Sequence, residues 1–240
     1  MDSPSMFNRL ALALPDIPRW VETRSMLLSG RCEVMGLQEA ESLSFVVRGP
    51  EDELVSVIGF PDGEVIKEAA RRNRNRGAVL APPESGDHVA AALKDWTISP
   101  ATIHLLGDAP DLPPVPEGTV RLLEPFEMDS LKGLPADLRE ELEYVSRISI
   151  VAATIVEGHP VSFCYVASET ESLWDISIDT LAGYRQRGYA GLCVAFLIDY
   201  MRERGKEPVW GAEESNIVSM RLAAKLGFVP ADRLMVFLRE

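Results

Sequence analysis

A mixed α/β fold (α+β) in two parts is predicted by three features of the sequence. Short apolar runs of strand length alternate with longer segments of helical periodicity, a pattern typical of sheets covered by helices. The segment Gly107–Gly118 contains four prolines and two glycines, which can continue neither a helix nor a central strand. With 240 residues, 46% of them hydrophobic, the chain can bury a core without disulfides. We therefore expect a smaller N-terminal α/β domain over residues 1–110, a Pro-rich linker over 111–118 and a second domain over 119–240.

The composition argues against several functional classes. The 37 Asp and Glu residues outnumber the 24 Lys and Arg residues, and the net charge of −13 argues against nucleic acid or an anionic membrane as the main ligand. The three cysteines, Cys32, Cys164 and Cys193, have no metal-like or redox spacing, so we expect reduced thiols in a cytoplasmic protein. The histidines are scattered, so no metal site is expected. No apolar run reaches the roughly 20 residues of a membrane span, and a homodimer stays open as an alternative to a monomer.

The N-terminal part begins with a short apolar stretch, Leu10–Leu14, which is a poor signal peptide because Pro15 stops it. Two strand-like runs, Leu43–Gly49 and Leu54–Phe60, follow with a turn between them. The further expected elements are a helix over Gly63–Arg76, a strand over Ala78–Ala81, a helix over His88–Asp95 and a strand near Thr102–Leu106. Four arginines between positions 71 and 76 complement the dipole at the end of the first helix, and we interpret them as a solvated helix end.

The C-terminal part has the expected order β-α-β-β-β-α-β-α-β. Its expected elements are a strand over Val120–Leu123, a helix over Met128–Tyr144 interrupted near Gly133–Pro135, strands over Ile148–Val156, Val161–Ala167 and Leu173–Leu181, a helix over Tyr189–Arg204, a strand over Pro208–Ala212, a helix over Asn216–Leu226 and a strand over Leu234–Leu238. The glycines at 205 and 227 stop the two helices that precede them.

The loop between the strand ending near Leu181 and the helix starting at Tyr189 carries the clearest chemical signal. A helix start presents unpaired backbone N–H groups at the positive end of the helix dipole, and phosphate groups bind there. Gly188 and Ala190 allow a ligand to approach the backbone, while Arg185 and Arg187 add positive charge. The residues alone therefore predict an anion site at a strand-helix junction, with an ordinary turn carrying exposed arginines as the alternative.

Two motifs resemble a known family. Arg185-Gln186-Arg187-Gly188-Tyr189-Ala190 is similar to the acetyl-CoA pyrophosphate loop, Q/R-x-x-G-x-G/A, of the GNAT superfamily of N-acetyltransferases. The segment Asn216–Phe228 resembles the later helix of that family, which reads N-x-x-[AS] and ends in K-L-G-F. The two motifs occur in the family's order with the expected elements between them. The resemblance covers roughly Thr119 to Glu240 and implies the GNAT fold for that half, with an extra N-terminal domain as in one bacterial subgroup.

The resemblance implies acetyl-CoA as cosubstrate, a small-molecule or protein amine as acceptor, and no metal. It implies that the backbone of the loop holds the pyrophosphate, that the strand edge binds the pantetheine arm, and that an N–H near Ile178 stabilises the oxyanion. The cofactor-binding residues implied in this way are Ile178, Thr180, Arg185, Gln186, Arg187, Gly188, Tyr189, Ala190 and Asn216.

The catalytic residues that the resemblance implies are less uniquely defined. The acceptor amine must lose a proton before it attacks, so a carboxylate is needed as the base. Glu213, Glu214 and Asp179 are candidates, and we prefer Glu213 because it ends the strand expected beside the thioester. Ser219 is placed to hydrogen-bond the leaving thiolate.

The sequence departs from the family in two ways. Ala223 stands where many members have a tyrosine acid, which keeps a second function open: a catalytically silent CoA-binding regulatory or interaction module. Only one strand follows Gly227, so the missing sheet edge must be tolerated or filled by the first domain. The N-terminal domain is either a diverged partner or a degenerate GNAT-like repeat, although it lacks a second R-x-x-G-x-A loop.

Overall fold

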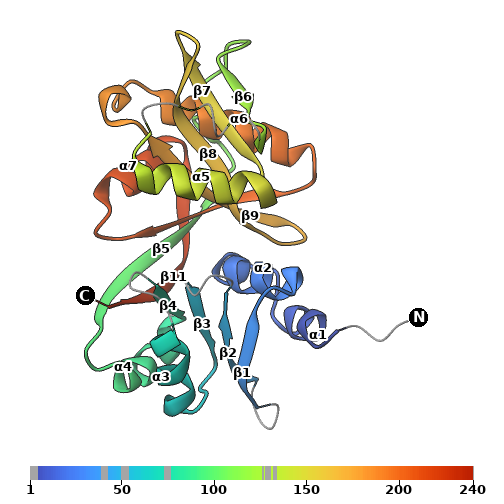
Figure 1. Cartoon of the computed structure of the whole chain (residues 1–240), viewed down its shortest axis with the longest axis vertical. Coiled ribbons are helices and arrows are strands. Elements are labelled where there is room, and N and C mark those ends of the chain that lie inside the picture. Colours follow the sequence, from blue (N-terminus) through green and yellow to red (C-terminus); the bar gives the residue numbers. More distant parts are fainter. Residues whose placement is uncertain are drawn as a thin grey trace. The chain divides into compact units, whose positions relative to one another are not determined.

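The structure is a computed structural model that describes residues 5–38, 43–49, 54–72, 77–125, 127, 131 and 134–239. The chain forms two compact units (Figure 1), and both are discontinuous in sequence. The first comprises Met1–His104, Gly211–Met220 and Pro230–Glu240, and the second comprises Leu105–Trp210 and Arg221–Val229. The units are therefore not the sequence domains 1–110 and 119–240, whose boundary at 111–118 stays a prediction.

The first unit begins with two helices and continues with a sheet. Helices α1 (Met6–Ala13) and α2 (Val21–Ser29) are joined through the 3-10 turn η1 (Pro18–Trp20). The following elements are β1 (Glu33–Gln38), β2 (Ser44–Arg48), β3 (Leu54–Ile58), α3 (Gly63–Arg72), β4 (Ala78–Ala81), η3 (Pro83–Ser85), α4 (Gly86–Ala92) and β5 (Thr97–Leu106). In the sheet β1, β2 and β3 are antiparallel neighbours, β3 is parallel to β4, and β4 is antiparallel to β11 (Phe228–Leu238).

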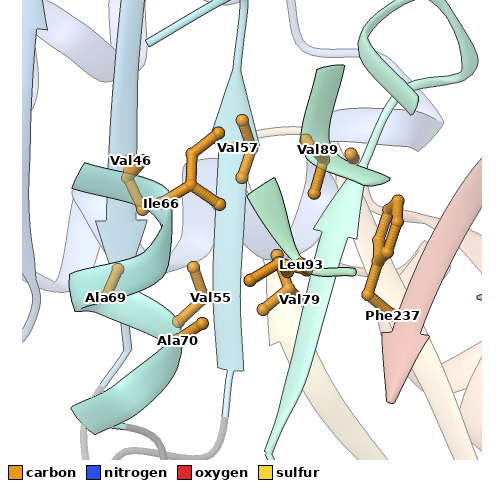
Figure 2. Packing of buried hydrophobic residues seen from close by; sticks show 11 residues of the cluster. Val46, Val55, Val57, Ile66, Ala69, Ala70, Val79, Val89, Leu93 and Phe237 are labelled. Carbon is orange, nitrogen blue, oxygen red and sulfur yellow. The ribbon is translucent and has the colours of Figure 1, made fainter. Parts of the chain in front are cut away.

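Helices cover both faces of this sheet because its strands are buried on both sides. Ile66, Ala69 and Ala70 of α3 pack against one face, where Phe237 of β11 and Val89 of α4 complete the cluster (Figure 2). The strand residues on that face are Val46, Val55, Val57 and Val79. Their neighbours Phe45, Val47 and Ile58 belong to the opposite cluster, with Leu10, Leu14 and Leu27 of the first two helices. Successive strand side chains point to opposite faces, so near-continuous apolar runs fill both layers.

The elements α1, α2 and β1 are not predicted by the sequence pattern. In α2 the helical periodicity is broken by buried polar side chains: Arg24 is only 4% exposed, and its guanidinium donates hydrogen bonds to the carbonyls of Ala11 and Leu14. Thr23 is also buried and lies 2.6 Å from the Ser56 hydroxyl. A polar side chain that is buried because it hydrogen-bonds the carbonyl groups at the end of a neighbouring helix cannot be recognised as a core position from a hydrophobic pattern.

The second unit has a sheet with a helix on each face. Its elements are β6 (Val120–Leu122), α5 (Ala136–Ile148), β7 (Val151–Val156), β8 (His159–Glu169), β9 (Leu173–Thr180), η5 (Ala182–Tyr184) and α6 (Tyr189–Arg202). The elements β10 (Glu207–Glu213), α7 (Ile217–Lys225) and β11 each contribute residues to both units. The strands are adjacent in the order β6-β7-β8-β9-β10, antiparallel except for the parallel β9–β10 pair. Leu138 and Leu142 of α5 pack with Phe163 on one face. On the other, the Cys193 thiol of α6 donates to the Ala152 carbonyl at 3.3 Å.

The same order of elements occurs twice in the chain. The series β1-β2-β3-α3-β4-α4-β5 corresponds to β7-β8-β9-α6-β10-α7-β11, and in each case two antiparallel pairs are followed by a short parallel pair. Helices also precede each series. The N-terminal half therefore repeats the topology of the C-terminal half, although its loop sequence has diverged. The last strand, β11, pairs with β4, so the first domain supplies the sheet neighbour that the C-terminal half lacked.

The end of α7 shows why the K-L-G-F segment needs its glycine. Gly227 has φ of +86°, and an added Cβ would lie 2.7 Å from the Cα of Pro110. The Gly107 N–H also donates to the Gly227 carbonyl at 3.0 Å. The Pro-rich segment is thus packed against the glycine at this turn.

Most predicted elements exist, with corrected bounds. The predicted start of a strand at Ile148 is wrong because α5 continues to that residue, and β7 begins at Val151. The strand expected over Leu234–Leu238 begins at Phe228, and the one expected near Thr102 begins at Thr97. The helix predicted from Met128 begins at Ala136 after Pro135, while positions 128–130 lie outside the described residues, as do positions 73–76 with two of the clustered arginines.

Candidate functional site

The loop between β9 and α6 is held in a strained, open conformation. Gln186 has φ of +61° and Gly188 has φ of +85°, both in the left-handed region that non-glycine residues rarely adopt. The Arg185 side chain turns back, and its Nε donates to the Thr180 carbonyl at 3.0 Å. The Arg187 guanidinium lies 5.7 Å from the centre of the Tyr184 ring. Both arginines are thereby kept beside the start of α6, and the residues from Arg185 to Gly188 are exposed.

The N-terminus of α6 lacks a side-chain cap. Gly188 is its N-cap residue and makes no side-chain hydrogen bond, and an added Cβ would meet nothing within 4 Å. The first backbone N–H groups of a helix need acceptors, which a side chain, water or a ligand must supply. Because a glycine, two arginines and the positive end of the dipole meet here, these residues fit a pyrophosphate.

The corresponding helix of the first repeat gives an internal comparison. There the Asp62 carboxylate accepts from the Glu64 N–H at 2.8 Å, and the Asp62 carbonyl accepts from the Val65 N–H at 3.0 Å. Asp62 therefore caps α3 with a negative charge at the position that a phosphate would need. Of these two equivalent helix starts, the one at Gly188 is open to an anion, and the one at Asp62 is already occupied by a carboxylate.

Beside this loop, one edge of β9 turns backbone groups away from β8. The Leu181 N–H donates to the Val161 carbonyl of β8 at 3.0 Å. Because hydrogen-bonded and non-bonded pairs alternate along an antiparallel ladder, Asp179 directs its backbone groups toward β8, whereas Ile178 and Thr180 direct theirs toward the other edge. The parallel pairing with β10 ends at Asp175↔Val209 in the described register. The edge at Ile178 and Thr180 can therefore accept an extended ligand.

Asp179 belongs to a group of ionisable side chains on the α5 face of the sheet. The Tyr165 hydroxyl donates to Oε1 of Glu141 at 2.6 Å and lies 3.4 Å from Oδ2 of Asp179. Burial raises the pKa of the Asp179 carboxyl above its ordinary value, and the charge of Glu141 raises it further, while the Tyr165 hydrogen bond and Arg185 act in the opposite direction. A carboxylate with a raised pKa is a suitable proton acceptor near neutral pH.

The sequence analysis did not single out Tyr165 or Glu141. Tyr165 lies within an apolar strand, where the pattern indicates only a core residue, and it is 1% exposed. Glu141 is one of several acidic residues of α5, where charge indicates a solvated helix face. Only the packing of α5 on β8 and β9 brings their polar ends together, so no signal in the sequence could have identified the pair.

The other predicted site residues lie in the first unit. The Asn216 side chain accepts from the Ser219 N–H at 3.1 Å and so caps α7. Glu213 ends β10 and is half-buried. Glu214 accepts from the Thr102 hydroxyl at 3.1 Å and lies 3.8 Å from Arg233, which supports a structural role for this carboxylate. Asp179, Ile178, Thr180 and the loop residues 185–190 all belong to the second unit.

Several residues have the core roles expected of them. Cys164 and Cys193 are fully buried, and burial raises the pKa of the Cys193 thiol to about 12, so neither is a nucleophile. Trp210 is 1% exposed and packs edge-on against Phe228, with ring centres 5.3 Å apart. Trp174 is also fully buried in β9.

Two general searches of the described residues gave no site. None of the described helices combines the length and the apolar composition required to cross a bilayer. Among the same residues, no group of three or more His, Cys, Asp or Glu side chains is arranged to hold a metal ion.

Comparison with known proteins relates this geometry to a family. Residues 151–237 match the family model described as GNAT acetyltransferase. A GCN5-related N-acetyltransferase-like protein from Streptococcus suis has a similar structure, with a TM-score of 0.69, 18% identity, and coverage of 97% of this chain and 98% of that one. The structure of a putative acetyltransferase of the GNAT family from Novosphingobium aromaticivorans is also similar, with a TM-score of 0.61 and 17% identity. The match covers 93% of this chain and 96% of that one.

A tandem GNAT protein from the clavulanic acid biosynthesis pathway is also similar, with a TM-score of 0.50, 15% identity, and coverage of 85% and 81%. No protein with a curated description matches the chain. The resemblance indicated by the two motifs is confirmed, and the GNAT fold extends to nearly the whole chain.

Proposed function

From the match of residues 151–237 to the GNAT acetyltransferase family and from the GNAT fold, we propose that this protein transfers an acetyl group from acetyl-CoA to an amine by direct attack in a ternary complex. The observation that carries the proposal is the uncapped start of α6 at Gly188, beside two exposed arginines, in contrast to the Asp62-capped start of α3. The acceptor is a small molecule or a protein amine.

Acetyl-CoA supplies an activated thioester, and this chain's residues hold and orient it. The backbone N–H groups from Arg185 to Ala190 bind the pyrophosphate, and Arg185 and Arg187 add charge. The edge of β9 at Ile178 and at the Thr180 N–H hydrogen-bonds the pantetheine arm as an added strand does. The Ile178 N–H polarises the thioester carbonyl. Asn216 and Ser219 stay predicted acetyl-CoA contacts.

Asp179 is the base that the local geometry supports best. It follows Ile178 directly on β9, and its raised pKa suits removal of a proton from an acceptor ammonium group. Glu213, preferred from the sequence, stays the second candidate. Ser219 is proposed to donate to the leaving thiolate, since Ala223 is fully buried and offers no acid.

The buried Ala223 also supports the second candidate function, a CoA-binding module without catalysis. A cytoplasmic location is proposed because Cys32, Cys164 and Cys193 are all free thiols, as expected in a reducing compartment.

Calorimetric titration with acetyl-CoA and a thiol-release assay on a panel of amines test these proposals. We expect binding, and turnover with at least one amine. Asp179→Asn is expected to abolish turnover while leaving the Kd for acetyl-CoA unchanged, and Glu213→Gln is the matched comparison. Loss of turnover only in Glu213→Gln would make Glu213 the base. Tight binding without turnover on any amine would favour the silent module, and no binding of acetyl-CoA would refute both functions.

A further inference from the structure

Three side chains of the second unit form a line from a half-buried carboxylate to solvent. Asp179 is half-buried on β9, Tyr165 is 1% exposed on β8, and Glu141 is exposed on α5. The Tyr165 oxygen lies 2.6 Å from Glu141 Oε1 and 3.4 Å from Asp179 Oδ2. One buried phenol therefore contacts two carboxylates, of which Glu141 is the more exposed to water.

The single proton of the phenol determines what this arrangement can do. A neutral tyrosine donates one hydrogen bond and accepts others. With its hydrogen on Glu141, its oxygen, which also accepts from Ser177, has a second lone pair that can accept from Asp179 once Asp179 is protonated. Burial and the hydrogen bond to Glu141 keep the pKa of the phenol far above its ordinary value, so Tyr165 stays neutral. Proton movement through it must then be concerted, without a phenolate.

We propose that Tyr165 relays the proton taken up by Asp179 to Glu141, from which it passes to water. This rests on the proposed function, in which Asp179 removes a proton from the acceptor amine. Protonated Asp179 donates its proton to the Tyr165 oxygen while the phenol proton moves to Glu141. At the end Asp179 is again a carboxylate, Tyr165 is again neutral, and Glu141 carries the proton. Tyr165 and Glu141 are positioning residues, since they act on the reaction only through Asp179.

The surroundings of Asp179 make such a path useful. Asp179 faces Glu141 and Asp137 from α5, Tyr165 from β8, and Arg185 from the following loop. A base that is half-buried and has a raised pKa holds its proton, and the next turnover cannot begin until that proton leaves. The exposed carboxylate of Glu141 lets the proton of Asp179 reach water without any opening of the sheet.

Steady-state kinetics at increasing imidazole concentration test the relay. In dilute buffer, Tyr165→Phe and Glu141→Gln should each lower kcat by roughly tenfold or more, with KM for acetyl-CoA unchanged. Imidazole should restore kcat in both, because a small base can take the proton from Asp179 directly. The double variant should be no slower than either single variant. Glu140→Gln, which neutralises the adjacent exposed residue of α5, is the matched control and should match the wild type.

A titration independent of turnover separates the relay from the proposed function. Carbon NMR of the Asp179 carboxyl, followed as a function of pH, should show a titration midpoint that shifts in Tyr165→Phe, which removes the hydroxyl 3.4 Å from Oδ2, and that falls in Glu141→Gln, which loses a repelling charge. If the wild type turns over, the relay would be overturned by a kcat of Tyr165→Phe equal to that of the wild type. It would also be overturned by a lowered kcat that imidazole does not restore. A wild type without turnover would refute the proposed function. An Asp179 titration midpoint that is unchanged in both variants would then overturn the relay as well, and a midpoint that shifts in both variants would support the coupling of the three residues.

Discussion

Replacing Gly188 by alanine separates ligand binding from folding at the start of α6. Gly188 has φ of +85°, where an L residue is strained by about 1–2 kcal/mol. Alanine also lowers the entropy of the unfolded chain, which offsets about 0.4–1 kcal/mol of that strain. Because the new Cβ would meet nothing within 4 Å, no steric cost is added. The expected loss in free energy of unfolding is therefore only about 1 kcal/mol.

The effect on acetyl-CoA should be larger than this small loss of stability implies. The Cβ of alanine would occupy the open space in front of the uncapped N–H groups, where we expect the pyrophosphate. Calorimetric titration should show at least about a tenfold weaker Kd, which corresponds to 1.4 kcal/mol. Urea denaturation of the same variant measures the stability separately.

Gly158→Ala is the matched control for this prediction. Gly158, in the turn between β7 and β8, has φ of +79°, and an added Cβ would also meet nothing within 4 Å. The two variants should thus lose similar stability, while only Gly188→Ala loses acetyl-CoA affinity. Equal affinities in both variants, or equal losses, would refute the assignment of the phosphate site to this loop.

Three further predictions concern other parts of the chain. Gly227→Ala should destabilise by more than about 2 kcal/mol in urea denaturation, because it adds a contact of 2.7 Å with Pro110 to the left-handed strain. Arg19→Met should lower the free energy of unfolding by about 1–3 kcal/mol at pH 7, since it removes a bidentate, partly buried ion pair with Asp232 at 2.6 and 2.7 Å. Because the pKa of Asp232 is lower in the folded than in the unfolded chain, the ion pair stabilises the fold above the unfolded pKa of Asp232, and this stabilisation is lost as the pH falls through the folded pKa. In urea denaturation at a series of pH values, Asp232→Asn should therefore reduce the loss of unfolding free energy on acidification. The raised pKa of Asp179 predicts that kcat/KM falls on acidification at a pH above the ordinary aspartate range, and a pH-rate profile with its midpoint at or below that range would contradict this.

The second half was more predictable from sequence than the first, for a physical reason. The proposed phosphate loop requires a glycine and nearby positive charge, and the Gly227 turn must keep a glycine against Pro110, so both leave short signatures. Strands such as Ala78–Ala81 were also predictable, because an apolar run bounded by turn residues has few alternatives. The α1–α2 pair was missed because its buried Arg24 serves carbonyl groups that no local pattern reveals.

The candidate base could not be chosen from sequence because its properties come from packing. Asp179 and Glu213 both follow apolar strand residues, and nothing in their neighbouring sequence separates them. The difference lies in Tyr165 and Glu141, which reach Asp179 from another strand and a helix. A pKa set by such contacts has no sequence period. The repeated topology was likewise hidden, since strand order survives after loop sequences have changed.

The pairing of β11 with β4 has a consequence for how the chain is made. Residues 235–238 pair with residues 78–81, about 150 positions earlier, and Phe237 fills the core between the sheet and α3. During synthesis the N-terminal half emerges first, yet its sheet lacks this neighbour until the C-terminal strand has left the ribosome. In that interval the open edge of β4 is a place where another chain could pair. The N-terminal half therefore depends for its completion on a strand that is translated much later, and the two repeats reach their native state together.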